Sequence, residues 1–186
     1  MTRALILIDF QKGFEAPIWG QRNNKDAEPN AAGLLAAWRA GHAPVAHVRH
    51  ASTQADSPLA KGSAGFAFMD ALAPTGDEPV FEKSVNSAFI GTGLEAYLRN
   101  HSIKAVVIAG LTTPHCVSTS ARMAANLGFE VILAHDACAT FARNGDMSWS
   151  DASIAIDPET SHQIAVAHLH GEFVRAQSCD EILKSL

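Results

Sequence analysis

A cysteine stands where the chain passes from an apolar run to a helix-like one. The run Ala105-Val-Val-Ile-Ala-Gly110 is short and β-branched, which is typical of a buried strand. Residues 111–117 follow with Cys116 among them, and 118–127 has a helical pattern closed by Gly128. A thiol at a helix N-terminus lies in the positive end of the helix dipole, which lowers its pKa and favours the nucleophilic thiolate. Because most free cysteines are inert core residues, the chemical interpretation needs partners for this one.

Two further reactive side chains end other strand-like runs. Asp9 follows the apolar run 4–8, and Lys83 ends the run 79–83. Ligands of open α/β sheets bind beyond the carboxyl ends of the strands, so an acid, an amine and a thiol are expected at one edge. They supply a proton carrier, a cation and a nucleophile, the parts needed for acyl transfer through a covalent intermediate. Taken singly, Asp9 could cap a turn, Lys83 could be a solvated loop residue and Cys116 could be core.

The elements that must position these residues alternate along the chain. Strands are predicted at 4–8, 45–48, 79–83, 105–109, 130–134 and 172–176, and helices at 31–40, 92–100, 118–127, 161–170 and from 180 onward. Near-continuous apolar strands alternating with helices predict a doubly wound, three-layer α/β/α fold of Rossmann-like type, with a mostly parallel, about six-stranded sheet. Thr92 is the expected N-cap of its helix. Residues 51–78 are predicted to be loop, and 143–158 a lid or surface loop.

Composition narrows the class of protein. The 186 residues are 47% hydrophobic, enough for one domain, 1–186, with a full core. A net charge of −5 without a cluster of Lys and Arg argues against nucleic acid as a partner. Three widely spaced cysteines fit a reducing cytosol better than a disulfide framework. Without a signal-peptide pattern or a run long enough to span a bilayer, we expect a cytoplasmic protein that does not bind membranes.

The sequence resembles the isochorismatase-like cysteine hydrolases, which include nicotinamidases, N-carbamoylsarcosine amidases, biuret hydrolases and streptothricin hydrolases. The resemblance covers nearly the whole chain. It is carried by Leu5-Ile-Leu-Ile-Asp-Phe-Gln11, by Glu82-Lys-Ser-Val-Asn-Ser-Ala-Phe89, by Gly110-Leu-Thr-Thr-Pro-His-Cys-Val-Ser-Thr119 and by His135-Asp-Ala137. It implies the isochorismatase-like fold and places the family's Asp-Lys-Cys triad on Asp9, Lys83 and Cys116.

The same resemblance implies a mechanism and a set of site residues. Cys116 would attack the carbonyl carbon of a small amide, lactam or ureide to form a thioester, and Asp9 would carry the thiol proton to the leaving nitrogen. Lys83 would hold Asp9 in place and help keep the sulfur anionic. The family's oxyanion hole maps onto the backbone amides of Thr112 and Cys116, with a non-proline cis peptide between Leu111 and Thr112. The residues expected to contact substrate are Phe14, Asn86, Phe89 and His115.

His47 and His50 invite a metal interpretation, and nicotinamidases do carry a metal near this point. They bind it with an aspartate and several histidines, whereas 46–52 contains no aspartate here. Residues three apart on a strand also point to opposite faces. We therefore expect no metal, with His47 in the core and His50 available to the pocket. No G-x-G-x-x-G follows the first strand, so no dinucleotide or other cofactor is expected.

Two other functions remain open at this point. The first is isochorismatase-type hydrolysis of a vinyl ether, although those relatives tend to lack the nucleophilic cysteine. The second is a catalytically idle member of the family that works as a binding or scaffold protein. Relatives assemble into dimers or larger oligomers, so the resemblance also implies a homo-oligomer (a dimer or tetramer), with 51–78 and 143–158 as candidate contact segments. The physiological substrate is not predicted, because fold does not set specificity.

Overall fold

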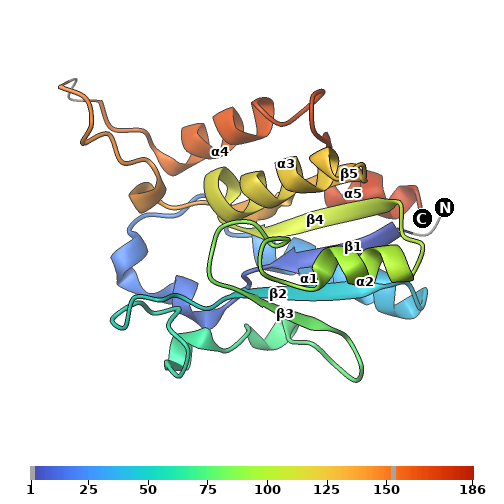
Figure 1. Ribbon diagram of the computed structural model, residues 1–186. Coiled ribbons are helices and arrows are strands. Elements are labelled where there is room, and N and C mark those ends of the chain that lie inside the picture. Colours follow the sequence, from blue (N-terminus) through green and yellow to red (C-terminus); the bar gives the residue numbers. More distant parts are fainter. Residues whose placement is uncertain (1–2, 152–153) are drawn as a thin grey trace.

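The computed structural model describes residues 3–151 and 154–186. Within them, six strands form one sheet in the order β3-β2-β1-β4-β5-β6 (Figure 1). The strands are β1 (Arg3–Ile8), β2 (Val45–His50), β3 (Val80–Lys83), β4 (Ala105–Leu111), β5 (Glu130–Ala139) and β6 (Arg175–Gln177). Every neighbouring pair is parallel, so the predicted mostly parallel sheet is parallel throughout its described strands.

Helices cover both faces of this sheet, which gives the predicted three layers (Figure 1). They are α1 (Ala27–Ala40), α2 (Leu94–Asn100), α3 (Ser118–Asn126), α4 (Pro158–Ala167) and α5 (Cys179–Lys184). Side chains of a strand alternate between the two faces. In β1, Leu5 and Leu7 belong to the buried cluster that includes residues of α1 and α5, whereas Ile6 and Ile8 belong to the cluster of α2 and α3. Both cores therefore meet at β1, and the site lies at the end of this strand.

The predicted boundaries were wrong at several ends, for local reasons. The first helix begins at Ala27 because Pro29 is tolerated within a first turn. The fourth begins at Pro158, where Asp157 caps it by accepting a hydrogen bond from Thr160 N at 3.0 Å. β5 runs on to Ala139 because its register against β4 shifts between Ile108 and Gly110. β6 is confined to Arg175–Gln177. α2 begins at Leu94 after Gly93, and Thr92 is not its N-cap residue.

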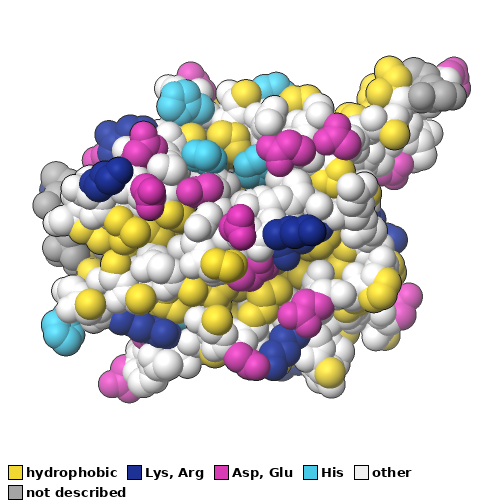
Figure 2. All heavy atoms as spheres, turned by 180° about the vertical axis from the view of Figure 1, so that it is seen from behind, with side chains coloured by type: hydrophobic (Ala, Val, Ile, Leu, Met, Phe, Trp, Pro, Cys, Tyr) yellow, Lys and Arg dark blue, Asp and Glu magenta, His cyan; other side chains and the backbone are white. Residues whose placement is uncertain are grey.

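The surface bears an arm and few other prominent features. Residues 145–151 and 154–157, which we term the arm, run outward beside α4, and Figure 2 shows hydrophobic side chains on it. On the face seen in Figure 2, Lys and Arg side chains are interspersed with Asp and Glu. None of the described helices combines the length and the hydropathy needed to cross a membrane.

The carboxyl ends of β1 and β4 approach each other closely. Gly110, with φ of 154°, faces Ile8, and a Cβ at this position would collide with the Ile8 backbone. Only glycine therefore permits this approach. Asp9, the residue after Ile8, has a φ of 57°, in the left-handed region that aspartate tolerates better than most residues. The chain thus turns sharply out of β1 at the residue predicted to carry the proton.

Candidate active site

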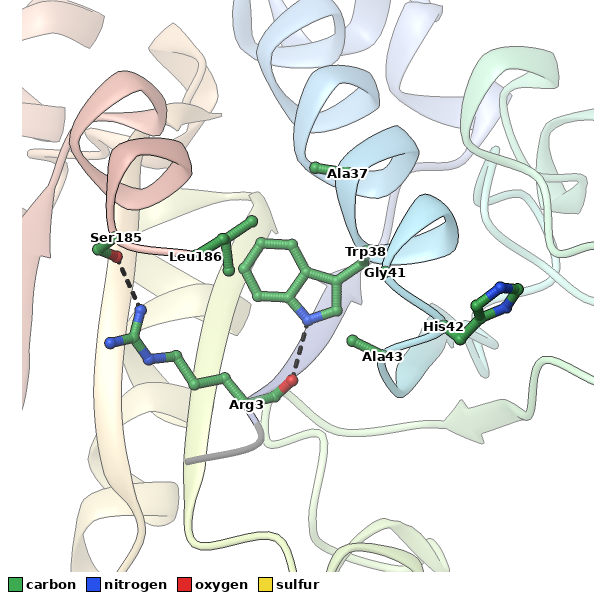
Figure 3. A pocket seen from close by; sticks show the side chains of 8 residues that line it. All are labelled: Arg3, Ala37, Trp38, Gly41, His42, Ala43, Ser185 and Leu186. Carbon is green, nitrogen blue, oxygen red and sulfur yellow. Dashed lines mark hydrogen bonds between the residues drawn. The ribbon is translucent and has the colours of Figure 1, made fainter.

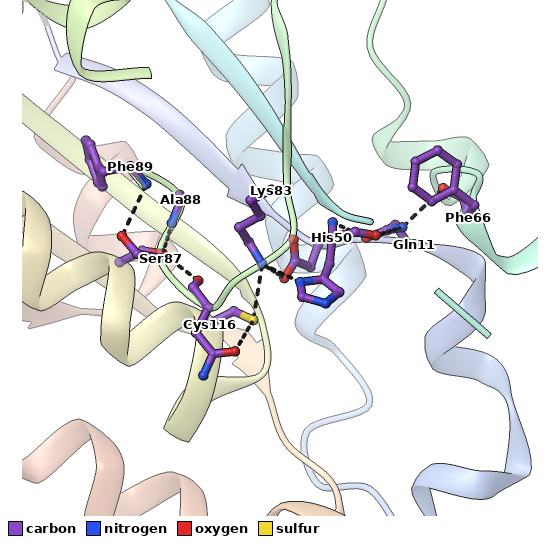
Figure 4. Close-up of polar contacts among 11 residues, drawn as sticks. Gln11, His50, Phe66, Lys83, Ser87, Ala88, Phe89 and Cys116 are labelled. Atoms are coloured by element: carbon purple, nitrogen blue, oxygen red, sulfur yellow. Dashed lines mark hydrogen bonds and ion pairs between the residues drawn. The ribbon is translucent and has the colours of Figure 1, made fainter. Parts of the chain in front are cut away.

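Asp9, Lys83 and Cys116 meet at the carboxyl edge of the sheet. Lys83 Nζ donates hydrogen bonds to Asp9 Oδ2 at 2.7 Å and to Cys116 Sγ at 3.2 Å. The side chains of the Asp9–Lys83 ion pair are fully buried. Figure 4 shows Lys83 directed at the sulfur of Cys116. The three residues come from the ends of β1, β3 and β4, which is the convergence that a parallel sheet imposes.

Cys116 is presented by a π-helical turn, Thr113–Val117, that leads into α3. Pro114 lies in its first turn, where a missing N–H is tolerated. The peptide bond between Leu111 and Thr112 is cis, as predicted. The thiol also lies 3.8 Å from Asn86 Oδ1, a long contact in which sulfur is the donor.

The pKa of Cys116 is raised, whereas the sequence predicted a lowered pKa for a thiol at a helix N-terminus. Burial raises the pKa of the Cys116 thiol, and the nearby carboxylate of Asp9 raises it further. The positive charge of Lys83 lowers the thiol pKa, but by less than burial and Asp9 raise it. Burial also opposes the charge of Lys83, yet Asp9 and Cys116 outweigh it, and the pKa of Lys83 is raised. The free site therefore holds a protonated thiol beside an ammonium, and the sulfur needs a base before it can attack.

Asp9 has an oxygen available for that proton. Its Oδ2 accepts from Lys83, whereas Oδ1 is buried and has no hydrogen-bond partner among the described residues. A carboxylate oxygen of Asp9, a ring nitrogen of His50 and Cys116 Sγ lie within 4.8 Å of one another. These are donor types that also bind metal ions, but Lys83 Nζ contacts all three residues and already supplies a cation among them.

A cavity of about 130 Å³ opens onto the sulfur. Its walls are Asp9, Phe14, Trp19, His50, Leu59, Asn86, Thr112, His115, Cys116 and Asn144. Five of the expected contact and oxyanion residues thus line it, namely Phe14, Asn86, Thr112, His115 and Cys116. Phe89 does not. Its ring packs in the core with Phe129, at 6.2 Å between centroids, because the turn after Lys83 directs it away from the cavity.

Other lining residues were not predicted from the sequence. Asn144 donates to His115 Nδ1 at 3.1 Å and accepts from Phe141 N, which holds it at the rim. Leu59 belongs to the long loop 51–78, where no periodic pattern marks it. Trp19 follows the first strand, and its indole N–H donates to Gly13 O at 2.7 Å. Proximity to Phe14 in sequence was the available signal for Trp19.

His47 lies apart from the cavity, as predicted for a residue on the other face of β2. A larger cavity of about 500 Å³ lies beside the amino end of β1 (Figure 3). It is lined in part by Arg3, Trp38 and Ser185. Arg3 donates to Ser185 Oγ at 2.8 Å, and Trp38 Nε1 donates to Arg3 O at 2.9 Å. No cysteine lines this cavity among the described residues, and the hydroxyl of Ser185 donates to Ile182 O at 2.8 Å, so its proton is already engaged by a backbone carbonyl.

Comparison with known proteins places this geometry in a family. Residues 3–181 match the Isochorismatase domain. The chain is 41% identical over 182 residues to the uncharacterized isochorismatase family protein YrdC of Bacillus subtilis strain 168, covering 97% of this chain and 94% of that protein. It is 32% identical over 152 residues to the maleamate amidohydrolase of Pseudomonas putida KT2440, covering 72% and 70%.

The fold agrees with solved structures. A crystal structure of an isochorismatase-family hydrolase from Chromobacterium violaceum superposes with a TM-score of 0.92 at 41% identity, covering 99% of this chain and 93% of that one. Both the sequence match and this superposition extend over nearly the whole chain. The chain therefore belongs to the isochorismatase family of hydrolases.

Proposed function

We propose that this protein is a cysteine hydrolase that cleaves a C–N bond of a small amide, lactam or ureide through a thioester. The supporting observation is the shared ammonium. Lys83 contacts both Asp9 and Cys116, while the second oxygen of Asp9 has no partner among the described residues and Asp9 lines a cavity that reaches the sulfur. Nucleophile, base and cation are thus in one place, which is the arrangement needed for covalent catalysis. The name of the maleamate amidohydrolase relative supports the same class of bond.

In the first half-reaction, Cys116 Sγ attacks the carbonyl carbon while Asp9 Oδ1 accepts the thiol proton. The developing oxyanion would be stabilised by the backbone N–H groups of Thr112 and Cys116. Asp9 then gives the proton to the nitrogen, the C–N bond breaks and the amine leaves. A thioester remains on Cys116. Because the thiol pKa is raised, little thiolate forms without a base, and this transfer to Asp9 is what makes the sulfur nucleophilic.

In the second half-reaction, water attacks the thioester carbonyl and Asp9 accepts its proton. The C–S bond breaks, the acid is released, and the proton returns from Asp9 to the sulfur. The sum is one amide and one water converted to one acid and one amine. Throughout, the buried ammonium of Lys83 keeps a positive charge beside whichever of Asp9 and Cys116 is anionic.

The cavity favours a small substrate. Its volume of about 130 Å³ lies below the roughly 300–1,000 Å³ of ordinary ligand pockets. Phe14, Trp19 and Leu59 give it apolar walls, and Asn86 and His115 offer polar groups. A compact, planar amide or ureide fits this combination. Within residues 3–151 and 154–186, no Lys or Arg side chain lines the cavity.

The test is a panel of nicotinamide, biuret, N-carbamoyl amino acids and cyclic amides, assayed for release of ammonia or acid. Intact-protein mass spectrometry of quenched reactions should show an acyl adduct, and peptide mapping should place it on Cys116. Cys138 and Cys179 serve as internal controls because both are buried and neither lines the cavity. Turnover without any adduct, and undiminished in a Cys116→Ala variant, would exclude the covalent route.

We also propose that the chain forms a homo-oligomer through the arm, residues 145–151 and 154–157. Its described part exposes Trp149 at 80% and Ile154 at 60%, and apolar residues on a projecting segment are typical of an interface. Light scattering of the protein should give a mass above that of one chain, and Trp149→Ser should lower it. Ile90→Ser is the matched control, because Ile90 is 52% exposed elsewhere. A monomeric wild type would contradict the proposal.

A further inference from the structure

The ammonium of Lys83 has a third partner. His50 Nδ1 lies 3.1 Å from Lys83 Nζ. An ammonium has three N–H donors and no acceptor, and Asp9 Oδ2 and Cys116 Sγ take two of them. The remaining N–H is therefore available to His50. Because an ammonium can only donate, His50 Nδ1 must be unprotonated and the proton of the neutral ring must lie on Nε2.

The His50 main chain is fixed by a neighbouring strand end. Gln11 is fully buried, and its Oε1 accepts from His50 N at 2.7 Å. Gln11 Nε2 donates to His50 O at 3.1 Å and to Phe66 O at 3.2 Å (Figure 4). The side-chain amide of Gln11 thus pairs with both polar groups of the His50 backbone.

We propose that His50 is a positioning residue of the active site, whose Nδ1 accepts the third N–H of Lys83 and so holds the ammonium between Asp9 and Cys116. Its catalytic meaning rests on the proposed function. Without this acceptor, a buried ammonium would keep one N–H unpaired, which is a heavily penalised state for a charged group. The ammonium would turn toward water in the cavity, and its contact with the sulfur, the longest of the three at 3.2 Å, would weaken first.

The charges around His50 keep it in the accepting form. Toward the active site, the ring of His50 faces Lys83, Asp9 and Cys116. His50 also lines a different, neighbouring cavity, together with Asp56 and Arg143. Burial lowers the pKa of His50, and the charge of Lys83 lowers it further, against the opposing effect of Asp9. His50 is therefore neutral at pH 7, and protonation would set a second cation against Lys83.

Nitrogen-15 NMR of ring-labelled histidines tests this geometry directly in the intact protein. At pH 7, His50 should show the downfield shift of an unprotonated Nδ1 together with a protonated Nε2. In Lys83→Met, the pKa of His50 should rise, because a neighbouring positive charge has been removed. A protonated Nδ1 in the wild type, or a His50 titration unmoved by Lys83→Met, would overturn the proposal. Neither readout depends on turnover.

Two substitutions separate the acceptor from the bulk of the ring. His50→Asn keeps an acceptor close to the position of Nδ1, whereas His50→Leu keeps volume and removes it. The probe is iodoacetamide at pH 7: sulfur displaces iodide and the thiol proton leaves to Asp9. The Leu variant should alkylate Cys116 about 10- to 100-fold more slowly, the range found for groups that orient a site. The Asn variant should recover most of that loss.

His42→Asn is the matched control, because His42 is exposed beside the larger cavity and its φ of 51° suits asparagine. Alkylation of the Leu variant at the wild-type rate would overturn the positioning role. Should the Leu variant fail to fold, the Asn variant and the NMR readouts still decide. Loss of the Asn rescue, with a wild-type fold by circular dichroism, would also count against the proposal.

The outcome is separable from that of the proposed function. In one case, no acyl adduct forms on Cys116, but His50 has the expected tautomer and His50→Leu alkylates more slowly than His50→Asn. The hydrolase proposal then fails and the positioning role of His50 stands. If the adduct forms and the Leu variant turns over like the wild type, the hydrolase proposal stands and the role of His50 is refuted.

Discussion

Strand β2 carries two histidines three residues apart, and each meets a carboxylate and a cation. His47 Nε2 lies 2.9 Å from Glu78 Oε2, which also binds Arg39. We term Arg39, His47 and Glu78 the structural cluster. His50 meets Lys83, which binds Asp9 and Cys116. We term these four residues the active-site cluster. The two clusters use the same kinds of side chain on opposite faces of one strand.

The clusters differ in whether the carboxylate has a free oxygen beside a cavity. Glu78 accepts from Arg39 through both oxygens at 2.7 Å, from His47, and from Thr75 N at 2.9 Å. Asp9 Oδ1 has no partner among the described residues, and its residue lines the cavity with Cys116. Among the described residues, unpaired buried atoms also occur at Glu28, His47, Arg49 and Gln177, but none of these four residues lines this cavity. Under the proposed function, the active-site cluster is the one that can react, because its carboxylate oxygen Asp9 Oδ1 has no partner among the described residues and Asp9 lines a cavity.

The largest effect is expected from Cys116→Ala. Turnover of a substrate found with the panel should fall roughly 10⁴-fold or more, as when a covalent nucleophile is removed. The free energy of unfolding should change by about 1 kcal/mol or less, because the sulfur borders a cavity. Cys138→Ala should give the reverse pattern, since Cys138 is fully buried in the core: lower stability and wild-type turnover. Equal losses of activity in Cys116→Ala and Cys138→Ala would contradict a specific catalytic role for Cys116.

Lys83→Met should affect both function and stability. It leaves Asp9 as an unpaired buried charge, so the free energy of unfolding should fall by about 3–5 kcal/mol in urea titrations. Turnover should drop by about 10²–10⁴. The double variant Asp9→Asn, Lys83→Met replaces the pair by neutral groups, and Asn tolerates the left-handed backbone there. It should regain much of the stability and none of the activity. A double variant less stable than the single one would contradict this view of the pair.

The sequence predicted the layers, the parallel sheet and the positions of the reactive residues, because strand ends in such folds have few alternative places. It did not predict that Lys83 is shared with His50. That contact depends on Gln11, whose amide fixes the His50 backbone across two strand ends. It also missed the raised thiol pKa, since a helix N-terminus is visible in sequence while burial and the distance to Asp9 are not. Phe89 was misplaced because a turn decides which side of the strand end it faces.

Glu78→Gln should destabilise the protein and spare its chemistry. Arg39 and His47 would lose their carboxylate, which should lower the free energy of unfolding by about 1–3 kcal/mol. Alkylation of Cys116 and turnover should match the wild type. The pKa of Glu78 is lowered from 4.5 to about 2, chiefly by Arg39, so its stabilisation is present above pH 4.5 and lost as the pH falls toward 2. The stability difference between the two proteins should shrink over that range. A constant difference would show that Glu78 acts by packing alone.

The smallest expected effect is the histidine contribution to stability near neutral pH. Burial is the first cause that lowers the pKa of both His47 and His50, so each prefers to be neutral in the folded chain. As the pH falls below 6.5, unfolded histidines bind protons before these folded ones do, and stability is lost by about 1.4 kcal/mol for each unit of lowering. Melting temperatures measured from pH 8 to pH 5 should therefore decline. His50→Asn should decline less steeply, because it removes one such group. If the melting temperatures of the wild type and His50→Asn declined equally with falling pH, the pKa of His50 would be the same in the folded and unfolded chain. A lowered pKa would then not keep His50 in the neutral form that accepts from Lys83.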